Sequence, residues 1–388
     1  MNILFLEWHS FGNPFIKTAF ENLGHTIHSF PFPQSSVNTR NDETLASNIA
    51  KSILSLDIDF VFSFNYFPVA AIAAAACKVK YLSWTYDSPF VQLYSKTAAF
   101  KTNELFVFDS LDVSRLSSFG VPNVHYLPMA AANYDSILPS KTEEKAYSSE
   151  ITMVGSMYTE EKHGFMKRLE NLDDYTKGYL DAVVAAQSGI FGASILEESI
   201  TPAILEKLQE VCPIHGNGDG FESPEWTLAN YFLARSVTAK ERQDYIKALS
   251  RKHQVTLFTP SPTPDLPDVK NMGTLEYYHD APKAIKCAKI NLNISLRSIV
   301  HGIPLRCMDI FGCGGFLLTN YQADFEKHFI AGEDYAYYDS LTDLLDKADY
   351  YLKNDKERKE MAANALKKVR QEHTFEKRVL EMLSIAGF

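Results

Sequence analysis

The chain has 388 residues, with 38 lysines and arginines against 48 acidic residues, and its formal net charge at pH 7 is -10. This acidic balance argues against nonspecific binding to nucleic acid and against an anionic membrane as the main partner. The length predicts two domains, each large enough to bury its own hydrophobic core. We therefore expect a globular protein without a nucleic-acid partner, although a local basic pocket for a phosphorylated ligand stays compatible with the charge.

Cysteine usage and the lack of a long apolar run indicate the compartment. The five cysteines show neither paired nor metal-ligand spacing, which favours reduced thiols over a disulfide framework. Residues 1–6 lack the basic region of a signal peptide, and the alanine-rich stretch 69–77 is shorter than a membrane span. We expect a soluble, cytoplasmic protein with no transmembrane segment. The sequence makes no prediction of its oligomeric state.

Short apolar runs alternate with amphipathic segments in the first third of the chain. The runs that predict strands are residues 3–6, 26–30, 60–64, 81–85, 105–108 and 124–127. Amphipathic stretches, such as 14–23 and 45–56, lie between several of them. This rhythm is typical of βα units in a parallel sheet and predicts a first domain over residues 1–140. A polar, charged stretch at 136–150 is the predicted linker.

The second half starts at a predicted strand over residues 151–156. The following region, about 165–246, has a helical pattern, so we predict a second domain over 150–365 with a helical insertion. Further strands are predicted at 254–259, 269–273, 290–294 and 316–319. The charged end, 366–388, predicts a C-terminal helix that can pack back on the first domain. Two doubly wound domains would face a cleft, and ligands bind open α/β sheets at the carboxyl ends of their strands.

The segment HGIPLRCMDIFGCGG, residues 301–315, carries the most chemistry for its length. Pro304 suits the first turn of a helix, and Arg306 and Asp309 would then share one helix face. The helix start and the arginine fork favour a phosphate, and the acid could accept hydrogen bonds from a ribose. Spacing alone leaves open a buried helix with an Arg–Asp pair and a glycine C-cap.

Common nucleotide-binding motifs are missing. No GxGxxG follows the first predicted strand, and there is no Walker GxxxxGK[ST], which argues against dinucleotide and P-loop enzymes. The glycine-rich run 215–220 lacks the ligand pattern of a calcium loop and is predicted to be a solvated turn.

A set of segments resembles a known family. Residues 291–295, 301–306, Asp309 and 312–320 are similar, in this order, to the C-terminal part of CgeB-like (spore maturation protein type) glycosyltransferases. Segments 154–156, 273–277, 332–334, 350–352 and 373–378 also match in order, and segments 62–68 and 81–89 resemble the domain that commonly precedes it. The resemblance covers most of the chain except the region near 170–235.

This resemblance implies a GT-B fold, with two Rossmann-like domains and a nucleotide-diphosphate sugar held mainly by the second. It implies no metal and no cofactor, because arginine and a helix start offset the diphosphate charge. Carried onto this chain, Arg306 would bind the diphosphate and Asp309 the ribose. Gly314 and Gly315 would permit close packing beneath the nucleotide.

One departure from the family pattern leaves the mechanism open. Many retaining GT-B enzymes carry two glutamates eight positions apart, and this spacing holds His301 and Asp309 here. His301 is therefore a catalytic candidate that could donate to the diphosphate or to a sugar hydroxyl, or it is a structural residue at the helix start.

An inverting transferase needs a general base for the acceptor hydroxyl. Asp87 follows the predicted strand 81–85 and is our candidate base, with a turn residue or helix cap as the alternative. Asp109 follows the next strand in the same manner. The other acceptor-side candidates also follow strands: Glu7, Trp8, His9 and Asn65.

Three further residues are donor-side candidates. Ser156 ends a predicted strand where its N–H could reach a phosphate, and Arg297 could be a second cation for the diphosphate or form a surface ion pair. Tyr277 could contact the base or pack in the core. Arg242, in the helical region, is expected to be solvated.

The sequence thus predicts a metal-independent glycosyltransferase, of hexosyltransferase type, that uses a nucleotide-sugar donor and a glycan, cell-surface precursor or protein acceptor. The alternative is a noncatalytic sugar-nucleotide or glycan-binding subunit of the same fold. Another nucleotide-sugar enzyme, such as an epimerase-type hydrolase, is a second alternative.

Overall fold

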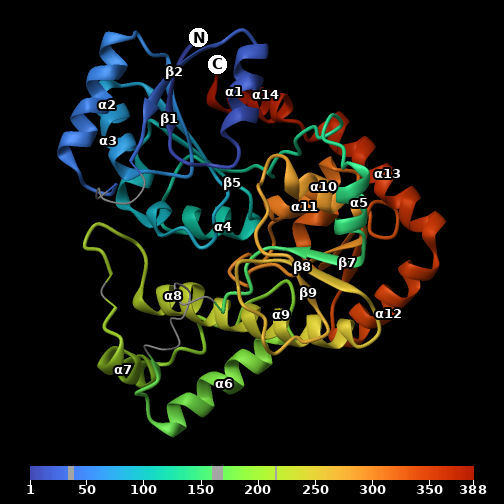
Figure 1. The fold of residues 1–388 in the computed structure, drawn as a ribbon. Coiled ribbons are helices and arrows are strands. Elements are labelled where there is room, and N and C mark those ends of the chain that lie inside the picture. Colours follow the sequence, from blue (N-terminus) through green and yellow to red (C-terminus); the bar gives the residue numbers. More distant parts are fainter. Residues whose placement is uncertain (34–38, 160–168, 215) are drawn as a thin grey trace. The chain divides into compact units, whose positions relative to one another are not determined.

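The computed structural model describes residues 1–33, 39–159, 169–214 and 216–388 (Figure 1). The chain divides into two compact units. Unit 1 comprises Met1–Ala132, Gly216–Glu222 and Glu372–Phe388, and unit 2 comprises Asn133–His215 and Ser223–Gln371. Unit 1 is therefore built from three separate stretches of sequence.

Unit 1 contains a six-stranded parallel sheet in the order β2-β1-β3-β4-β5-β6. Its strands are β1 (Asn2–Glu7), β2 (Thr26–Pro31), β3 (Phe60–Phe64), β4 (Lys80–Thr85), β5 (Asn103–Val107) and β6 (Val124–Tyr126). All five residues of β3 and of β5 are buried. This burial fits a parallel sheet that helices cover on both faces, and it includes the polar residues Ser63, Asn103 and Glu104.

The helices of unit 1 cover both faces of this sheet. They are α1 (Asn13–Asn22), α2 (Glu43–Ser55), α3 (Pro68–Cys77), α4 (Ser110–Ser118) and α14 (Phe375–Ala386), with short 3₁₀ helices η1 (Val91–Tyr94) and η2 (Lys96–Ala99). Helices α2 and α3 pack together, and α1 packs with α14 (Figure 1). The C-terminal helix is held in unit 1 by Arg378, whose Nε donates to the Pro128 carbonyl at 2.9 Å.

Unit 2 repeats this architecture with a second six-stranded parallel sheet, in the order β12-β11-β10-β7-β8-β9. Its strands are β7 (Ser149–Val154), β8 (Val255–Phe258), β9 (Lys270–Asn271), β10 (Ala288–Asn293), β11 (Leu317–Asn320) and β12 (Ala336–Tyr338). Both units are thus Rossmann-like α/β folds, as predicted. The short edge strand β12 is the one that the sequence reasoning missed.

The helices of unit 2 include a long excursion between β7 and β8. It contains α6 (Asp174–Ser188), α7 (Pro202–Val211), α8 (Pro224–Thr227), a π-helical turn η5 (Leu228–Leu233) and α9 (Ala234–Ser250). The remaining helices are α5 (Lys141–Tyr147), α10 (Asp280–Cys287), α11 (Leu305–Gly312), η6 (Ala323–Lys327), α12 (Leu341–Lys353) and α13 (Asp355–Glu372). Of the predicted insertion, residues 165–168 and 215 lie outside the described residues.

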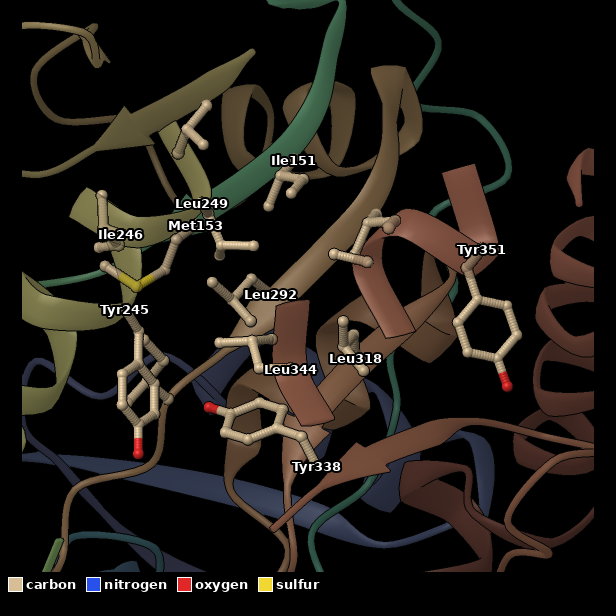
Figure 2. Close-up of a cluster of buried hydrophobic side chains, with 14 of the residues drawn as sticks. Ile151, Met153, Tyr245, Ile246, Leu249, Leu292, Leu318, Tyr338, Leu344 and Tyr351 are labelled. Carbon is tan, nitrogen blue, oxygen red and sulfur yellow. The ribbon is translucent and has the colours of Figure 1, made fainter. Parts of the chain in front are cut away.

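The core of unit 2 joins the sheet to α9 and α12. Figure 2 shows Ile151 and Leu292 of the sheet packed toward Leu249 of α9 and Leu344 of α12. Tyr338 of β12 is fully buried in the same cluster, and its hydroxyl donates to the Asn293 carbonyl at 3.1 Å. The excursion has a second, separate cluster around α6, α7 and α9. Its helices therefore have a core of their own.

The predicted linker at 136–150 has a different structure. The units divide between Ala132 and Asn133, and the polar stretch forms helix α5. Ser140 and Glu143 form a capping box at the start of this helix, which satisfies its free N–H groups. Glu143 also pairs with Lys283 at 2.7 Å. The polar residues that suggested a linker are therefore the cap and exposed face of a helix.

Candidate functional site

Helix α11 carries the central pair of the predicted donor site. It connects β10 to β11, so it begins at the carboxyl end of the parallel strands of unit 2. Pro304 is its N-cap residue, one position before the predicted first turn, and its side chain makes no cap hydrogen bond. Nη1 of Arg306 lies 3.2 Å from Oδ2 of Asp309. The two side chains thus share one face of the helix, as their spacing predicts.

The Asp309 carboxylate is enclosed, whereas Arg306 is not. The Tyr277 hydroxyl donates to Oδ1 of Asp309 at 2.8 Å, and the Tyr134 hydroxyl also bonds to this carboxylate. The Asp309 side chain is 6% exposed and that of Arg306 is 25% exposed. Burial raises the pKa of Asp309 above its usual value, and Arg306 and the two hydroxyls oppose that rise. Arg306 is the part of this cluster that an anion can reach.

Tyr134 is a member of this cluster that sequence reasoning missed. It is the second residue of unit 2, in a stretch without a motif, and is buried. Nearby Asp309 and the burial itself both raise the pKa of its hydroxyl, so it stays a neutral hydrogen-bond donor. Tyr277, predicted as a base contact, serves here as a donor to Asp309.

Gly314 and Gly315 do not lie where the nucleotide was predicted. They end α11, at the amino end of the strands, because the helix runs antiparallel to β10 and β11. Gly314 has a φ of +73°, and a Cβ on Gly315 would lie 2.6 Å from Nδ2 of Asn291. The glycines therefore serve the helix-to-strand turn, which accounts for both of them without a nucleotide.

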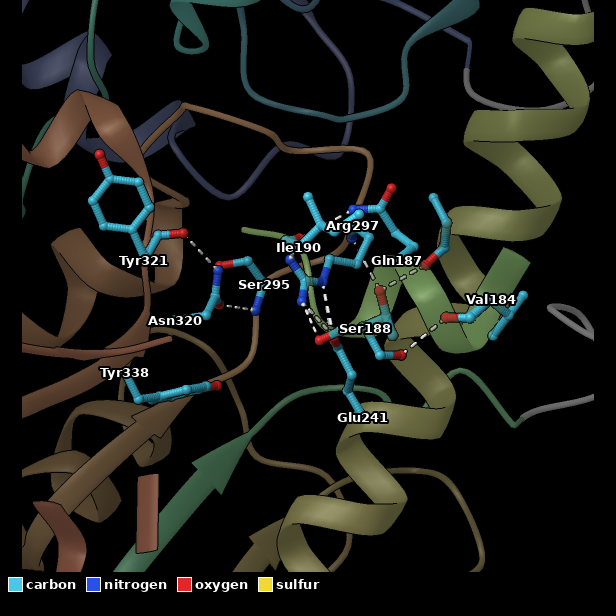
Figure 3. A network of polar contacts seen from close by, with 12 residues as sticks. Val184, Gln187, Ser188, Ile190, Glu241, Ser295, Arg297, Asn320, Tyr321 and Tyr338 are labelled. Atoms are coloured by element: carbon cyan, nitrogen blue, oxygen red, sulfur yellow. Dashed lines mark hydrogen bonds and ion pairs between the residues drawn. The ribbon is translucent and has the colours of Figure 1, made fainter. Parts of the chain in front are cut away.

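Arg297 is committed to a buried ion pair (Figure 3). Its Nε lies 3.0 and 2.9 Å from the two carboxylate oxygens of Glu241 on α9, and Nη1 donates to the Ile190 carbonyl at 3.1 Å. The Glu241 side chain is 2% exposed and that of Arg297 is 6% exposed. Since the charge is already matched, the prediction of Arg297 as a second cation for a diphosphate does not fit the structure. The alternative of a surface ion pair is also wrong, because the pair is buried.

Ser156 and Arg242 form a second buried network beside it. Arg242 was expected to be solvated, but its Nε donates to the Ile294 carbonyl at 3.1 Å and its Nη1 donates to the Ser156 carbonyl. The Ser156 hydroxyl accepts from the backbone N–H of Tyr158 at 2.8 Å. Ser156 therefore closes the turn after β7, and Arg242 binds this turn to the end of β10.

His301 lies against a loop of the excursion. Its Nε2 is 3.2 Å from the carbonyl oxygen of Gly192, and its own carbonyl accepts from the N–H of Asp324 at 3.0 Å. These contacts join the loop before α11 to two neighbouring segments. They match the structural role that the sequence left open for this histidine.

A pocket in unit 1 brings three of the acceptor-side candidates together. It has a volume of about 420 Å³ and lies at the carboxyl ends of β1, β3 and β4. Its lining residues are Trp8, Pro33, Thr39, Asn65, Phe67, Asp87, Phe90 and Gln92. The sequence predicted Trp8, Asn65 and Asp87 from their positions after strands. It missed the wall formed by Thr39, Phe67, Phe90 and Gln92, none of which directly follows a strand.

Asp87 is held by Asn65 inside this pocket. Asn65 has a φ of +58°, which asparagine tolerates, and its Oδ1 accepts from the backbone N–H groups of Tyr86 and Asp87 at 3.2 and 3.4 Å. Its Nδ2 donates to Oδ2 of Asp87 at 2.7 Å. The surrounding protein raises the pKa of Asp87, and the bond from Asn65 opposes the rise. A carboxyl with a raised pKa is suited to take a proton from a substrate.

The other acceptor-side candidates lie outside the pocket lining. Glu7 pairs with Lys17 at 3.1 Å, and His9 is exposed with its ring against Phe11. Asp109 is the N-cap of α4 and accepts from the N–H of Leu111 at 2.9 Å. Its position after a strand is thus explained by helix capping, whereas Asp87 lines the pocket.

Across the described ranges, no group of three or more His, Cys, Asp or Glu side chains is placed to hold a metal ion. Within the same part of the chain, no helix is long and apolar enough to cross a bilayer.

Two Rossmann-like units define the GT-B class, and the chain has this glycosyltransferase fold. Residues 235–384, which include α11 with Arg306 and Asp309, match the sequence model of a family described as "Glycosyl transferase-like". The match covers less than half of the chain and leaves the unit 1 pocket outside it. No curated protein matches the chain by sequence.

Solved structures share the fold over nearly the whole chain. A glycosyltransferase from Rickettsia africae is 12% identical, covers 99% of this chain and 97% of its own, and has a TM-score of 0.55. Sucrose-phosphate synthase from Thermosynechococcus elongatus is 11% identical, with 99% and 98% covered and a TM-score of 0.53. Anabaena HepE in complex with UDP-glucose is 10% identical, with 99% and 98% covered and a TM-score of 0.53. At such identities the likeness shows the fold alone.

Proposed function

We propose that the protein is a metal-independent glycosyltransferase that uses a nucleotide-diphosphate sugar as its donor. The observation that carries this proposal is Arg306, a partly exposed cation at the start of α11 in the segment that matches the glycosyltransferase-like family. A guanidinium beside a helix start suits a diphosphate. The presence of UDP-glucose in the Anabaena structure of the same fold supports this donor class.

In this proposal Arg306 binds the diphosphate and Asp309 the ribose. Oδ1 of Asp309 already accepts from Tyr277, whereas its buried Oδ2 lies 3.2 Å from Arg306 and has no hydrogen-bond partner among the described residues. Oδ2 is therefore the oxygen proposed to accept from a ribose hydroxyl. A hexosyl group is the proposed transferred sugar, and the ordered segments that resemble CgeB-like enzymes support membership of that subfamily.

On the acceptor side, Asp87 is the proposed general base. Its carboxylate takes the proton of the acceptor hydroxyl as the acceptor oxygen bonds to the anomeric carbon. The bond from that carbon to the diphosphate oxygen breaks, and its electron pair leaves with the nucleoside diphosphate. A single displacement of this kind inverts the anomeric centre. The acceptor is a glycan, a cell-surface precursor or a protein side chain.

Five free thiols support a reducing, cytoplasmic location for this activity. The donor claim is tested by thermal shift and calorimetry with UDP-, GDP- and dTDP-sugars on the full chain. We expect at least one of them to bind. Arg306→Ala should weaken that binding by at least about tenfold, the loss of one charge-assisted hydrogen bond, and Arg251→Ala should keep it. Arg251 is a matched control because it is exposed and precedes β8, so it lies at the amino end of the strands of the same sheet, opposite to Arg306. Binding by none of these nucleotide sugars would refute the proposal.

A turnover assay separates the enzyme from the noncatalytic alternative. Release of nucleoside diphosphate that depends on an added acceptor is expected for a transferase. Binding without such release would support a subunit that only binds the sugar nucleotide. Turnover that persists in EDTA is the expected result for a metal-independent reaction, and loss of activity that added Mg²⁺ or Mn²⁺ restores would refute that part.

A further inference from the structure

The chemical character of the unit 1 pocket narrows the acceptor. Trp8, Phe67 and Phe90 provide its apolar walls, with Trp8 and Phe90 each nearly perpendicular to Phe67 at 84° and 85°. The Trp8 indole N–H already donates to the Phe64 carbonyl at 2.7 Å, which fixes this ring. Rigid aromatic faces of this kind bind the apolar C–H face of a flat ligand.

Polar groups of the pocket are almost all neutral. Among the lining residues that the structure describes, Asp87 alone has an ionisable side chain, and the others that can hydrogen-bond are Thr39, Asn65, Gln92 and Trp8. Asp87 repels a phosphate or carboxylate, since like charges disfavour each other at short range. The pocket therefore suits an uncharged ligand with several hydroxyl groups.

Gln92 has an unfulfilled hydrogen-bonding group in this pocket. Its Nε2 donates to Oγ1 of Thr39 at 3.0 Å. Its Oε1 is buried and has no hydrogen-bond partner in the described part of the chain. A buried acceptor without a donor costs about 1–3 kcal/mol. A hydroxyl of a bound ligand would supply the missing donor.

Residues 216–222, which we call the strap, hold the wall that carries Gln92 and Thr39. Arg40, next to Thr39, lies 2.9 Å from Oδ1 of Asp219 and 3.1 Å from Oε1 of Glu222. Two carboxylates against one guanidinium leave this group with a net charge of -1, so Arg40 does not make the wall attractive to anions. These contacts hold the wall in place without giving it a positive charge.

We propose that this pocket binds an uncharged sugar residue of the acceptor, which makes the acceptor a neutral glycan. The proposal rests on the proposed function and narrows its acceptor class. A sugar ring offers an apolar face to Trp8 and Phe67 and hydroxyls to Asn65, Thr39 and Gln92. A peptide hydroxyl would leave most of these polar groups unmatched, and a phosphorylated precursor would meet the charge of Asp87.

Saturation-transfer NMR on the full chain tests this proposal without a donor present. The probes are glucose, galactose, mannose and N-acetylglucosamine, the 6-phosphates of the first three, and a serine-containing peptide. We expect at least one neutral sugar to bind, and its 6-phosphate to bind at least about fivefold more weakly. Equal or tighter binding of the phosphates, or binding of the peptide but of no neutral sugar, would overturn the proposal.

Two pocket variants give the residue-level test. Gln92→Leu keeps the side-chain size and is expected to weaken sugar binding by about five- to tenfold, the loss of one hydrogen bond. Trp8→Phe keeps an aromatic ring for folding and is expected to reduce binding to a smaller extent. The control Tyr175→Ala removes a 77% exposed ring on α6 and should change nothing. Wild-type sugar affinity in Gln92→Leu would contradict the assignment.

A nucleotide titration of the same sample separates the two proposals. Binding of a nucleotide sugar without binding of any neutral sugar refutes the neutral-glycan pocket and leaves the transferase proposal standing. If a neutral sugar binds and none of the nucleotide sugars does, the transferase proposal is refuted and a glycan site in unit 1 is supported.

Discussion

Replacing Arg306 by alanine tests whether the helix α11 cluster binds a nucleotide or only stabilises the fold. A charge-assisted hydrogen bond to a phosphate contributes about 1.5–3 kcal/mol, so its loss lowers nucleotide affinity by about 10- to 150-fold. The same change leaves the Asp309 carboxylate, 6% exposed, without its cation. Breaking a buried pair costs about 3–5 kcal/mol. Because Arg306 is 25% exposed and water screens the pair, we expect a loss of about 1–3 kcal/mol in unfolding free energy.

The two effects separate by pH and by a second substitution. Burial raises the folded-state pKa of Asp309, so its carboxyl is a stronger proton acceptor in the folded than in the unfolded chain. Without Arg306 the pKa rises further, and the lost stability returns as the pH falls through that pKa. Arg306→Ala/Asp309→Asn removes the unpaired charge. We expect this double variant to recover stability at pH 7 without recovering nucleotide binding.

Chemical denaturation from pH 4.5 to 8 and calorimetric titration of the bound nucleotide sugar provide the two measurements, with Arg251→Ala as the control. The reasoning is refuted if Arg306→Ala binds the nucleotide within twofold of the unmodified protein. It is also refuted if the double variant regains affinity, because the cluster would then act through the fold alone.

Three further changes test the remaining parts of the structure. Asp87→Asn should lower turnover by about 10²- to 10⁴-fold. In the unmodified protein kcat/KM should rise as the pH passes the raised pKa of Asp87, and the variant should lose this rise. A variant whose pH profile keeps its shape would exclude Asp87 as the base. Gly220→Ala should lower the free energy of unfolding by about 1–3 kcal/mol, because the new Cβ would lie 1.8 Å from Oε2 of Glu222 in the strap. The control Gly218→Ala places its Cβ where no atom lies within 4 Å and should leave stability unchanged in the same denaturation assay. Equal stabilities of the two variants would contradict this packing. Burial and nearby Asp109 raise the pKa of Asp112 to about 7, so ionisation of this carboxyl lowers the stability of the fold as the pH rises from 4 through 7. Asp112→Asn should therefore melt at a higher temperature than the unmodified protein at pH 8 and at the same temperature at pH 4. A difference in melting temperature that is the same at both pH values would contradict this.

Most of the fold could be predicted because buried parallel strands have a strong sequence signal. The predicted strand 60–64 has the same bounds as β3, since all its residues face packed helices. The edge strand β12 has only three residues, Ala336–Tyr338, too short for a pattern. The stretch 136–150 was misinterpreted because capping and surface residues have the same polar composition as a linker. The capping box of Ser140 and Glu143 is the local signal that distinguishes a helix start from a linker, and the contact between Glu143 and Lys283 adds a tertiary one.

The site could be predicted in part, for a related reason. Residues that directly follow strands, such as Asp87 and Asn65, could be placed at the carboxyl edge by topology alone. The partners of a charged residue could not be predicted, because they come from distant sequence. Arg297 is neutralised by Glu241, 56 positions earlier, and Asp309 is covered by Tyr277, 32 positions earlier. Sequence position indicated where these residues lie, and the contacts show which are available to a ligand.

The three-segment construction of unit 1 affects how the protein is made. Its first 132 residues are synthesised before any of unit 2, but the strap and the segment Glu372–Phe388 come later. Phe375 packs against Phe15 at 5.4 Å between ring centroids, and Phe388 packs against Phe60 at 5.0 Å. The rings of Phe15 and Phe60 therefore lack these partners on the ribosome until unit 2 has been translated, and exposed apolar surface of this kind favours aggregation.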